Sequence, residues 1–308
     1  MEWPLQGLKV YGKSTQDGVP SPESPVSIVS AGDSGSIDLT VSGANFFDSS
    51  LIPSQTQNGV SCTVLDDGSI YLNGTATVYA AFTTYIEAEN YVRLPQTFLT
   101  VSIHGSENRG GVVHALFRLR KDGTNMASFA TSNSQTIDIS GVDYDSIQIG
   151  IQVSPGSSVN ENFKIMANVG QNPAPWSPYS GFQSLTLSTP KGLPGIPVES
   201  GGTFTDADGQ RWICDVKDYG TGKYTQMVGR IESYNGEDIT TPYMSTTGQL
   251  SVGAEVYYVL DEPVVTDIPA EELAAYRALR TYDDTTIIST DEDISGLKVK
   301  YVAKAIDY

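Results

Sequence analysis

The sequence predicts an all-β protein, in which a jelly-roll β-sandwich is flanked by a second, smaller β domain with one short helix near the carboxyl end. Turn signals such as Asp66-Asp67-Gly68, Asn73-Gly74 and Lys121-Asp122-Gly123 punctuate the middle of the chain. No amphipathic helix interrupts this region, so we expect its strands to form a sandwich. The segments with strand character are 60–65, 69–77, 78–86, 97–104, 112–120, 126–130, 135–139, 146–153 and 162–169.

The chain divides into three parts by pattern. Residues 1–43 form an N-terminal β segment or connector, 44–180 the jelly roll, and 181–308 a β-rich C-terminal domain. The prolines of 172–179 end the middle block because proline cannot continue a central strand. One alternative stays open, in which the N-terminal segment pairs with residues 181–240 and the jelly roll is inserted into a discontinuous domain.

A single helix is predicted at about 269–280. A proline near its start, Glu271 and Glu272 in the first turn, and Arg277 and Arg280 in the last turn suit the helix dipole. A helix of this length is marginal alone, so its apolar side chains must pack on something.

The charge balance excludes some classes of function. The chain has 36 acidic and 18 basic residues, a net charge of −18 at neutral pH. Such a surface repels phosphate backbones and anionic lipid headgroups, so we expect neither nucleic-acid binding nor membrane insertion. The start, Met1 to Pro4, lacks the basic and apolar runs of a signal peptide, and we predict no leader and no transmembrane helix.

Two segments imitate catalytic or metal-binding motifs. Residues 31–36 read Ala-Gly-Asp-Ser-Gly-Ser, like the nucleophile segment of a serine protease, but the chain's only histidines, His104 and His114, lie in strand-like runs. We therefore expect a turn there. Residues 206–209 begin like a calcium loop without the downstream glutamate, and we expect a hairpin turn.

We predict no catalytic residues, no metal ligands and no cofactor, although a sandwich edge leaves room for a structural Ca²⁺. The many carboxylates lie mostly in turns, where turn chemistry and solubility explain them. Cys62 and Cys214 lie in separate strand-like runs and are expected to be buried free thiols, with a disulfide as the alternative.

Aromatic and planar polar side chains of the middle block are the candidate ligand-binding residues. Sugars bind by stacking on aromatic rings while planar polar groups reach their hydroxyls. Packing in the core of the sandwich is the competing explanation for each aromatic. The candidates are Tyr79, Tyr85 and Tyr91, expected around one hairpin with Phe82, together with His114, Arg118 and Arg120.

Three separated segments resemble tail and minor structural proteins of phages and prophages. They are residues 8–18, residues 189–198 with 208–215, and residues 273–282, while the block ending at 175–179 resembles the carbohydrate-binding, jelly-roll inserts of that group. The resemblance implies a non-enzymatic tail-fibre or baseplate component that helps attach the virion to a host surface. It also implies a virion location, other tail proteins and a host-surface glycan as partners, and a homotrimer with contacts at Leu273, Tyr276 and Leu279.

Two alternatives remain. The first is that glycan recognition by the jelly roll is the main function, and that the rest of the chain supports this domain. The second is a glycan-degrading enzyme, which needs a positioned pair of carboxyl groups.

Overall fold

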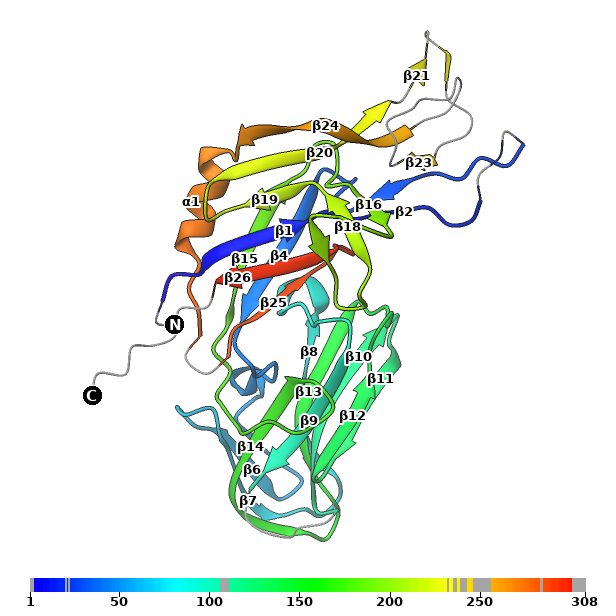
Figure 1. The fold of residues 1–308 in the computed structure, drawn as a ribbon. Helices are drawn as coiled ribbons and strands as arrows, with labels where there is room; N and C mark the ends of the chain where they lie inside the picture. Colours follow the sequence, from blue (N-terminus) through cyan, green and yellow to red (C-terminus); the bar gives the residue numbers. More distant parts are fainter. Residues whose placement is uncertain are drawn as a thin grey trace. The chain divides into compact units, whose positions relative to one another are not determined.

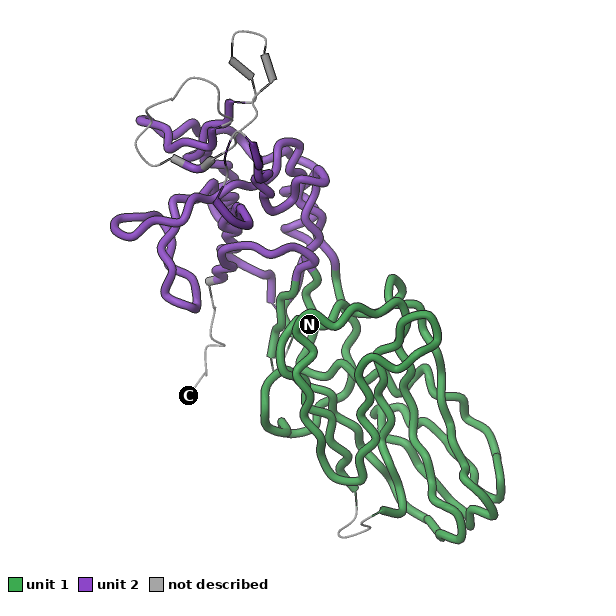
Figure 2. The backbone as a smooth tube through the Cα atoms, turned by 90° about the vertical axis from the view of Figure 1, so that its right-hand side faces the viewer, with its two compact units in different colours: residues 1–2, 40–183, 281–289 green, residues 3–39, 184–280, 290–308 purple. Residues whose placement is uncertain are grey.

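The fold was obtained as a computed structural model. It describes residues 3–19, 21, 23–105, 111–231, 233–234, 237–238, 243–245, 256–282 and 285–300. The described chain is built from β-strands with one short α-helix, so the predicted fold class is confirmed. Its contacts divide it into two compact units (Figure 2). Unit 1 holds the described residues of Thr40–Gln183 and Thr281–Ser289, and unit 2 those of Trp3–Leu39, Ser184–Arg280 and 290–300.

Unit 1 is a sandwich of two antiparallel sheets (Figure 1). Two 3₁₀ turns, Ser49–Leu51 and Ala88–Asn90, accompany the strands. The first sheet has the order β12 (Ser134–Asp138), β9 (Phe98–His104), β14 (Ser158–Val169), β7 (Ile70–Thr75), β6 (Val60–Val64), β5 (Gln55–Gln57). The second has the order β11 (Thr124–Thr131), β10 (Val113–Lys121), β13 (Ser146–Val153), β8 (Ala80–Glu87).

The eight strands from β7 to β14 have jelly-roll connectivity. The order β7-β14-β9-β12 in one sheet and β8-β13-β10-β11 in the other is that of two Greek keys wound together. Alternate side chains of both sheets meet in one core, which includes Phe47, Phe82, Phe117 and Phe129.

The structure corrects one turn prediction. Asn73-Gly74 is not a turn but lies within β7, where Gly74 is opposite Val60 of β6. A Cβ at Gly74 would come within 2.1 Å of the Gly59 carbonyl oxygen, so the glycine permits a close approach of two backbones. The expected hairpin is also wrong, because β7 and β8 belong to different sheets.

Unit 2 is built around a six-stranded sheet. Its order is β23 (Tyr243–Ser245), β24 (Val256–Asp267), β20 (Lys223–Ile231), β19 (Val216–Asp218), β1 (Gln6–Tyr11), β26 (Gly296–Lys300). Smaller sheets are β16 (Gly195–Val198), β18 (Arg211–Cys214) and β17 (Phe204–Thr205), then β2 (Ser14–Thr15) with β3 (Val29–Ser30), and β21 (Ser233–Tyr234) with β22 (Glu237–Asp238). A further sheet has the order β15 (Phe182–Ser188), β4 (Ser36–Ser42), β25 (Ile287–Thr290), and each of its strands contains one boundary between the units.

The only α-helix of the described residues is α1 (Ala270–Ala278), inside the predicted range. Pro269 precedes it, and Glu271 and Glu272 occupy its first turn. No helix among the described residues is long and apolar enough to span a membrane.

The structure confirms the predictions for the two cysteines and for two turns. Cys62 and Cys214 are buried free thiols, and burial raises the pKa of the first to about 11 and of the second to about 12. Residues 31–35 form a turn between β3 and β4, and 206–209 connect β17 to β18, as expected. His104 and His114 lie on strands β9 and β10.

The aromatic core predicts the cost of truncation in unit 1. Phe117 is fully buried, with its ring centroid 6.5 Å from that of Phe47 and 6.1 Å from that of Phe129. We expect Phe117→Ala to lower the free energy of unfolding by about 3–5 kcal/mol, measured by urea denaturation. Tyr79→Ala is the matched control, because Tyr79 is 57% exposed, and its loss should change stability by less than about 1 kcal/mol. Equal effects would contradict this core.

Candidate functional site

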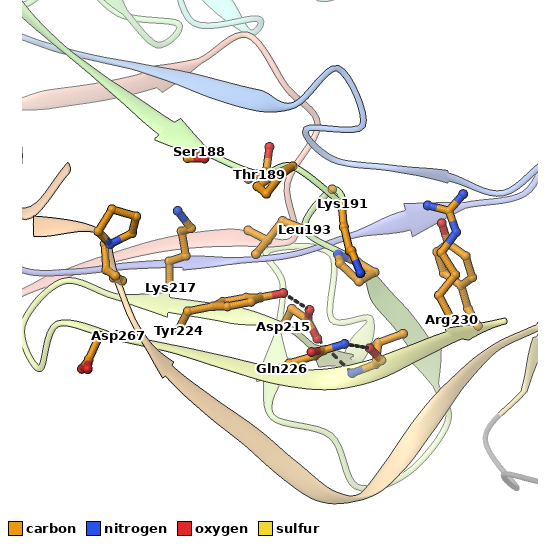
Figure 3. A pocket seen from close by; sticks show the side chains of 17 residues that line it. Ser188, Thr189, Lys191, Leu193, Asp215, Lys217, Tyr224, Gln226, Arg230 and Asp267 are labelled. Carbon is orange, nitrogen blue, oxygen red and sulfur yellow. Dashed lines mark hydrogen bonds between the residues drawn. The ribbon is translucent and has the colours of Figure 1, made fainter. Parts of the chain in front are cut away.

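A cavity in unit 2 is the candidate site (Figure 3). Its volume is about 320 Å³, within the range typical of small-molecule sites. Strands β19, β20 and β24 line it together with the loop that follows β15 and the residues that lead into α1. The lining residues are 188–194, Asp215, Lys217, Tyr224, Gln226, Val228, Arg230, Tyr257 and 267–269.

Asp215 is a buried carboxyl group in the wall, between β18 and β19. One oxygen accepts hydrogen bonds from the Met227 and Val228 amides at 2.7 and 2.9 Å, and the other accepts one from the Tyr224 hydroxyl. Two consecutive amides facing one oxygen mark an irregular strand, and the β20–β24 register shifts between Gln226 and Val228. Burial raises the Asp215 pKa to about 6, although the three hydrogen bonds oppose this shift.

Lys217 and Glu272 form a buried ion pair beside Asp215. The Lys217 ammonium lies 2.7 and 3.0 Å from the two Glu272 oxygens, and burial lowers the Lys217 pKa while the carboxylate opposes the shift. Glu272 also accepts hydrogen bonds from the Tyr219 hydroxyl and, at 3.1 Å, from the Ser188 amide. The pair thus fastens the first turn of α1 to β19 and to the end of β15.

The loop of residues 189–193 is held in place by hydrogen bonds. The Thr189 hydroxyl donates to the Gly32 carbonyl at 2.8 Å, and the Leu193 amide donates to the Ala31 carbonyl at 2.6 Å. Gly192 has φ of +70°, and a Cβ there would come within 2.5 Å of an Asp33 oxygen. This fixed loop carries the exposed Lys191, whose side chain extends toward β20 in Figure 3.

Apolar side chains form much of the remaining wall. Leu193, Val228, Tyr257 and Ile268 are almost fully buried, and the Arg230 guanidinium lies 5.3 Å from the Tyr257 ring centroid. A cavity with apolar walls and a few fixed polar groups can bind an organic molecule without reacting with it.

The charged groups deep in the cavity are already engaged. The Asp215 carboxylate, the Lys217 ammonium and the Tyr224 hydroxyl hydrogen-bond within the protein. These bonds fix the positions of the three groups in the cavity wall. Within the described residues no three or more His, Cys, Asp and Glu side chains are grouped so as to share a metal ion.

The aromatic residues predicted to bind a ligand do not come together. Tyr79 and Tyr85 are exposed, at 57% and 59%, but Tyr91 is only 5% exposed. The Tyr91 hydroxyl donates to the Phe46 carbonyl and accepts a hydrogen bond from the Asp48 amide at 3.1 Å. Tyr91 thus belongs to the core of unit 1.

Some of the other predicted residues share one row on the four-stranded sheet. Register places Tyr85, Gln148 and Arg118 side by side on β8, β13 and β10. Arg118 donates to Gln148 at 3.0 Å, and the Arg120 guanidinium lies 4.9 Å from the Tyr85 ring centroid. His114 is half-buried on β10, with its Nδ1 unpaired among the described residues. Their role in ligand binding stays a prediction.

The residues predicted to make subunit contacts pack within unit 2. Tyr276 is buried, with its ring centroid 5.0 Å from that of Tyr219, and Leu279 is buried just after the helix. Leu273 is half-buried on α1.

Sequence reasoning missed the cavity residues. Asp215, Lys217 and Tyr219 alternate along the chain and are all buried, so polar side chains occupy the inward face of this stretch. The alternation is visible in the sequence, but it does not say which face is buried. Glu272 was interpreted as a helix-dipole residue, and nothing in the sequence pairs it with Lys217.

Comparisons with known proteins give no family. No family model matches the chain, and no curated protein matches it. One solved structure found is of accessory secretory proteins 1, 2 and 3 of Streptococcus pneumoniae, with 9% identity, a TM-score of 0.31, and coverage of 41% of this chain and 98% of that chain. Another is the glycosylation-associated Gap123 complex of Streptococcus agalactiae, with 9% identity, a TM-score of 0.28, and coverage of 41% and 44%. Scores this low carry no functional assignment to this chain.

These comparisons correct the expectation drawn from resemblance. The solved structures named above are bacterial secretion and glycosylation proteins, and no family model or curated relative supports a phage tail protein. The resemblance is therefore wrong, and the tail-fibre or baseplate function, the tail-protein and host-glycan partners and the homotrimer inferred from it are wrong with it. The virion location stays a prediction.

Two ion pairs with the same contact distance should differ in how much they contribute to stability. Lys217–Glu272 and Lys223–Asp267 both have 2.7 Å contacts, but the first pair is buried and the second exposed. We expect Lys217→Met to cost about 3–5 kcal/mol in free energy of unfolding, because it leaves a buried carboxylate without its cation. The control Lys223→Met should cost about 0–1 kcal/mol. Urea denaturation at neutral pH checks both, and similar costs would contradict the proposed role of burial.

The Asp215 carboxyl predicts a pH-dependent stability. Its folded pKa of about 6 lies above that of an aspartate in an unfolded chain, about 3.9. Its stabilising contribution is therefore complete below about pH 4 and is lost as the pH rises through about 6. Asp215→Asn keeps an acceptor for both amides but cannot titrate. The unfolding free energy of the wild type minus that of Asp215→Asn should fall by about 2 kcal/mol between pH 4 and pH 7.

A second variant tests the cause of this shift. Tyr224→Phe removes a donor that stabilises the charged form of Asp215, so the window of falling stability should move to higher pH. Urea denaturation across the pH range measures both variants. A difference between wild type and Asp215→Asn that does not vary with pH would show that Asp215 is not the titrating group.

Proposed function

We propose that this protein is a non-enzymatic binding protein whose cavity in unit 2 takes a small organic ligand. The observation that carries the proposal is the preformed cavity of about 320 Å³, in which the deep charged groups are already bonded to protein partners. Such a wall can hold a ligand in place without exchanging protons with it.

The size and lining of the cavity support a small molecule. Small-molecule sites are mostly apolar, with a few polar groups that fix orientation. Leu193, Val228 and Tyr257 provide the apolar surface here. Asp215 and Glu272 hold the surrounding polar groups in place through hydrogen bonds. The cavity is therefore already formed before a ligand enters.

The absence of enzymatic activity belongs to the same proposal. Asp215 has a raised pKa, which is typical of a catalytic acid, but burial and its structural role at the strand irregularity account for the shift. Its oxygens already accept three hydrogen bonds from the chain, which leaves one of about four acceptor positions for a substrate.

Methyl NMR tests whether the cavity binds. The full-length protein is titrated with 4-phenylbutanoate, 4-phenylbutan-1-ol and 4-phenylbutan-1-amine, which share one apolar body. We expect at least one compound to shift the methyl resonances of the cavity residues Leu193, Val228 and Ile268 but not those of the exposed Val264. The bound compound should be recovered unchanged.

A filling variant separates the cavity from other surfaces. Gln226→Trp places a large side chain in the cavity and should abolish these shifts, while Gln57→Trp replaces another half-buried strand glutamine, in unit 1, and should not. No methyl shift with any of the three compounds, or conversion of the compound, would contradict the proposed function.

A further inference from the structure

We propose that the ligand of this cavity is a monoanion with an apolar body, and that Lys191 holds its anionic group. This inference rests on the proposed function and narrows it to one class of compound. It follows from the charges of the lining, the fixed position of the loop and the arrangement of the cavity's ends.

The charges of the lining favour an anion. Its basic side chains are Lys191, Lys217 and Arg230, and its acidic ones are Asp215 and Asp267. Glu272 neutralises Lys217, and Lys223 neutralises Asp267 at 2.7 Å. Lys191, by contrast, has no ion-pair partner within the part of the chain that the structure describes. In a chain with a net charge of −18, a cation left at a cavity is a local exception.

The loop presents this cation in a fixed place. Hydrogen bonds from Thr189 and Leu193 to the turn of residues 31–35 tie both ends of the loop, and the Gly192 amide donates to the Thr189 carbonyl at 2.9 Å. Binding therefore costs the entropy of the lysine side chain but not that of the loop backbone.

The two ends of the cavity differ in charge. In Figure 3 Lys191 lies on the Arg230 side of Asp215, while Asp267 lies at the opposite end. A cationic group on the ligand would need a carboxylate, but Asp267 is paired with Lys223, and the buried Asp215 already accepts three hydrogen bonds from the chain. The apolar side chains of Leu193, Val228 and Tyr257 suit an uncharged body, so a monoanion fits better than a zwitterion or a cation.

The three phenylbutyl compounds test the class of ligand, since they differ only in the head group and its charge. Calorimetric titration of the full-length protein should give an affinity for 4-phenylbutanoate about twofold to fivefold above that for the alcohol, and the amine should bind more weakly than the alcohol. The preference should shrink at high salt because Lys191 is exposed.

Substitution of Lys191 assigns the preference to one side chain. Lys191→Met should lower the affinity for the anion to that of the alcohol and leave alcohol binding unchanged, and Lys191→Arg should keep most of the preference. Lys121→Met is the control, because it removes the same charge from unit 1 and should alter neither affinity.

The outcomes separate the two proposals. Alcohol or amine binding equal to that of the anion, with methyl shifts at Val228, overturns the ligand class and leaves the proposed function standing. An anion preference that survives in Lys191→Met overturns the role of Lys191. Absence of methyl shifts for all three compounds overturns the proposed function itself.

Discussion

The buried contact between Lys217 and Glu272 is the constraint on which the site in unit 2 depends. Helix α1 has nine residues and is too short to be stable alone, and its buried positions are Glu272 and Tyr276. One of these two positions is a carboxylate. The helix is therefore docked through a charged group that receives hydrogen bonds from β19, from Tyr219 and from the end of β15.

Asp215 has a comparable role nearby on the same stretch of chain. Its carboxylate accepts two consecutive amides of β20 where that strand loses register with β24, so the irregular backbone keeps its hydrogen bonds without a strand partner. Asp215 and Lys217 alternate along the chain and so face the same side, where they line one cavity. The hydrogen bonds that hold the helix and the irregular strand thus also set the shape of the cavity wall.

Local sequence signals predicted the elements better than their arrangement. Period-two alternation located β9, β10 and β13 to within about two residues. The charged residues at the two ends of α1 located the helix. Asn73-Gly74 misled because a glycine that permits close backbone approach looks the same in sequence as a turn glycine.

The site could not be predicted, because it depends on pairs distant in sequence. Glu272 and Lys217 are 55 residues apart, and the loop that carries Lys191 is tied through Thr189 to Gly32, 157 residues from Thr189. The sequence could not group the aromatic candidates for a related reason, since Tyr91 looks like Tyr85 in sequence but hydrogen-bonds to Phe46 in the core. The resemblance of short segments to phage tail proteins did not predict these long-range contacts.

The composition of the cavity wall is itself an argument for binding. Apolar side chains of similar volume could fill such a wall at equal or better stability, because burying ions carries a desolvation cost that their mutual attraction only partly offsets. Unit 2 instead places Asp215 and Lys217 there, with Glu272 paired to Lys217, and leaves space beside them. Departures from the rules of core packing concentrate at functional sites. That concentration, together with the cation on a fixed loop, is the physical reason to place the function of this chain in this cavity.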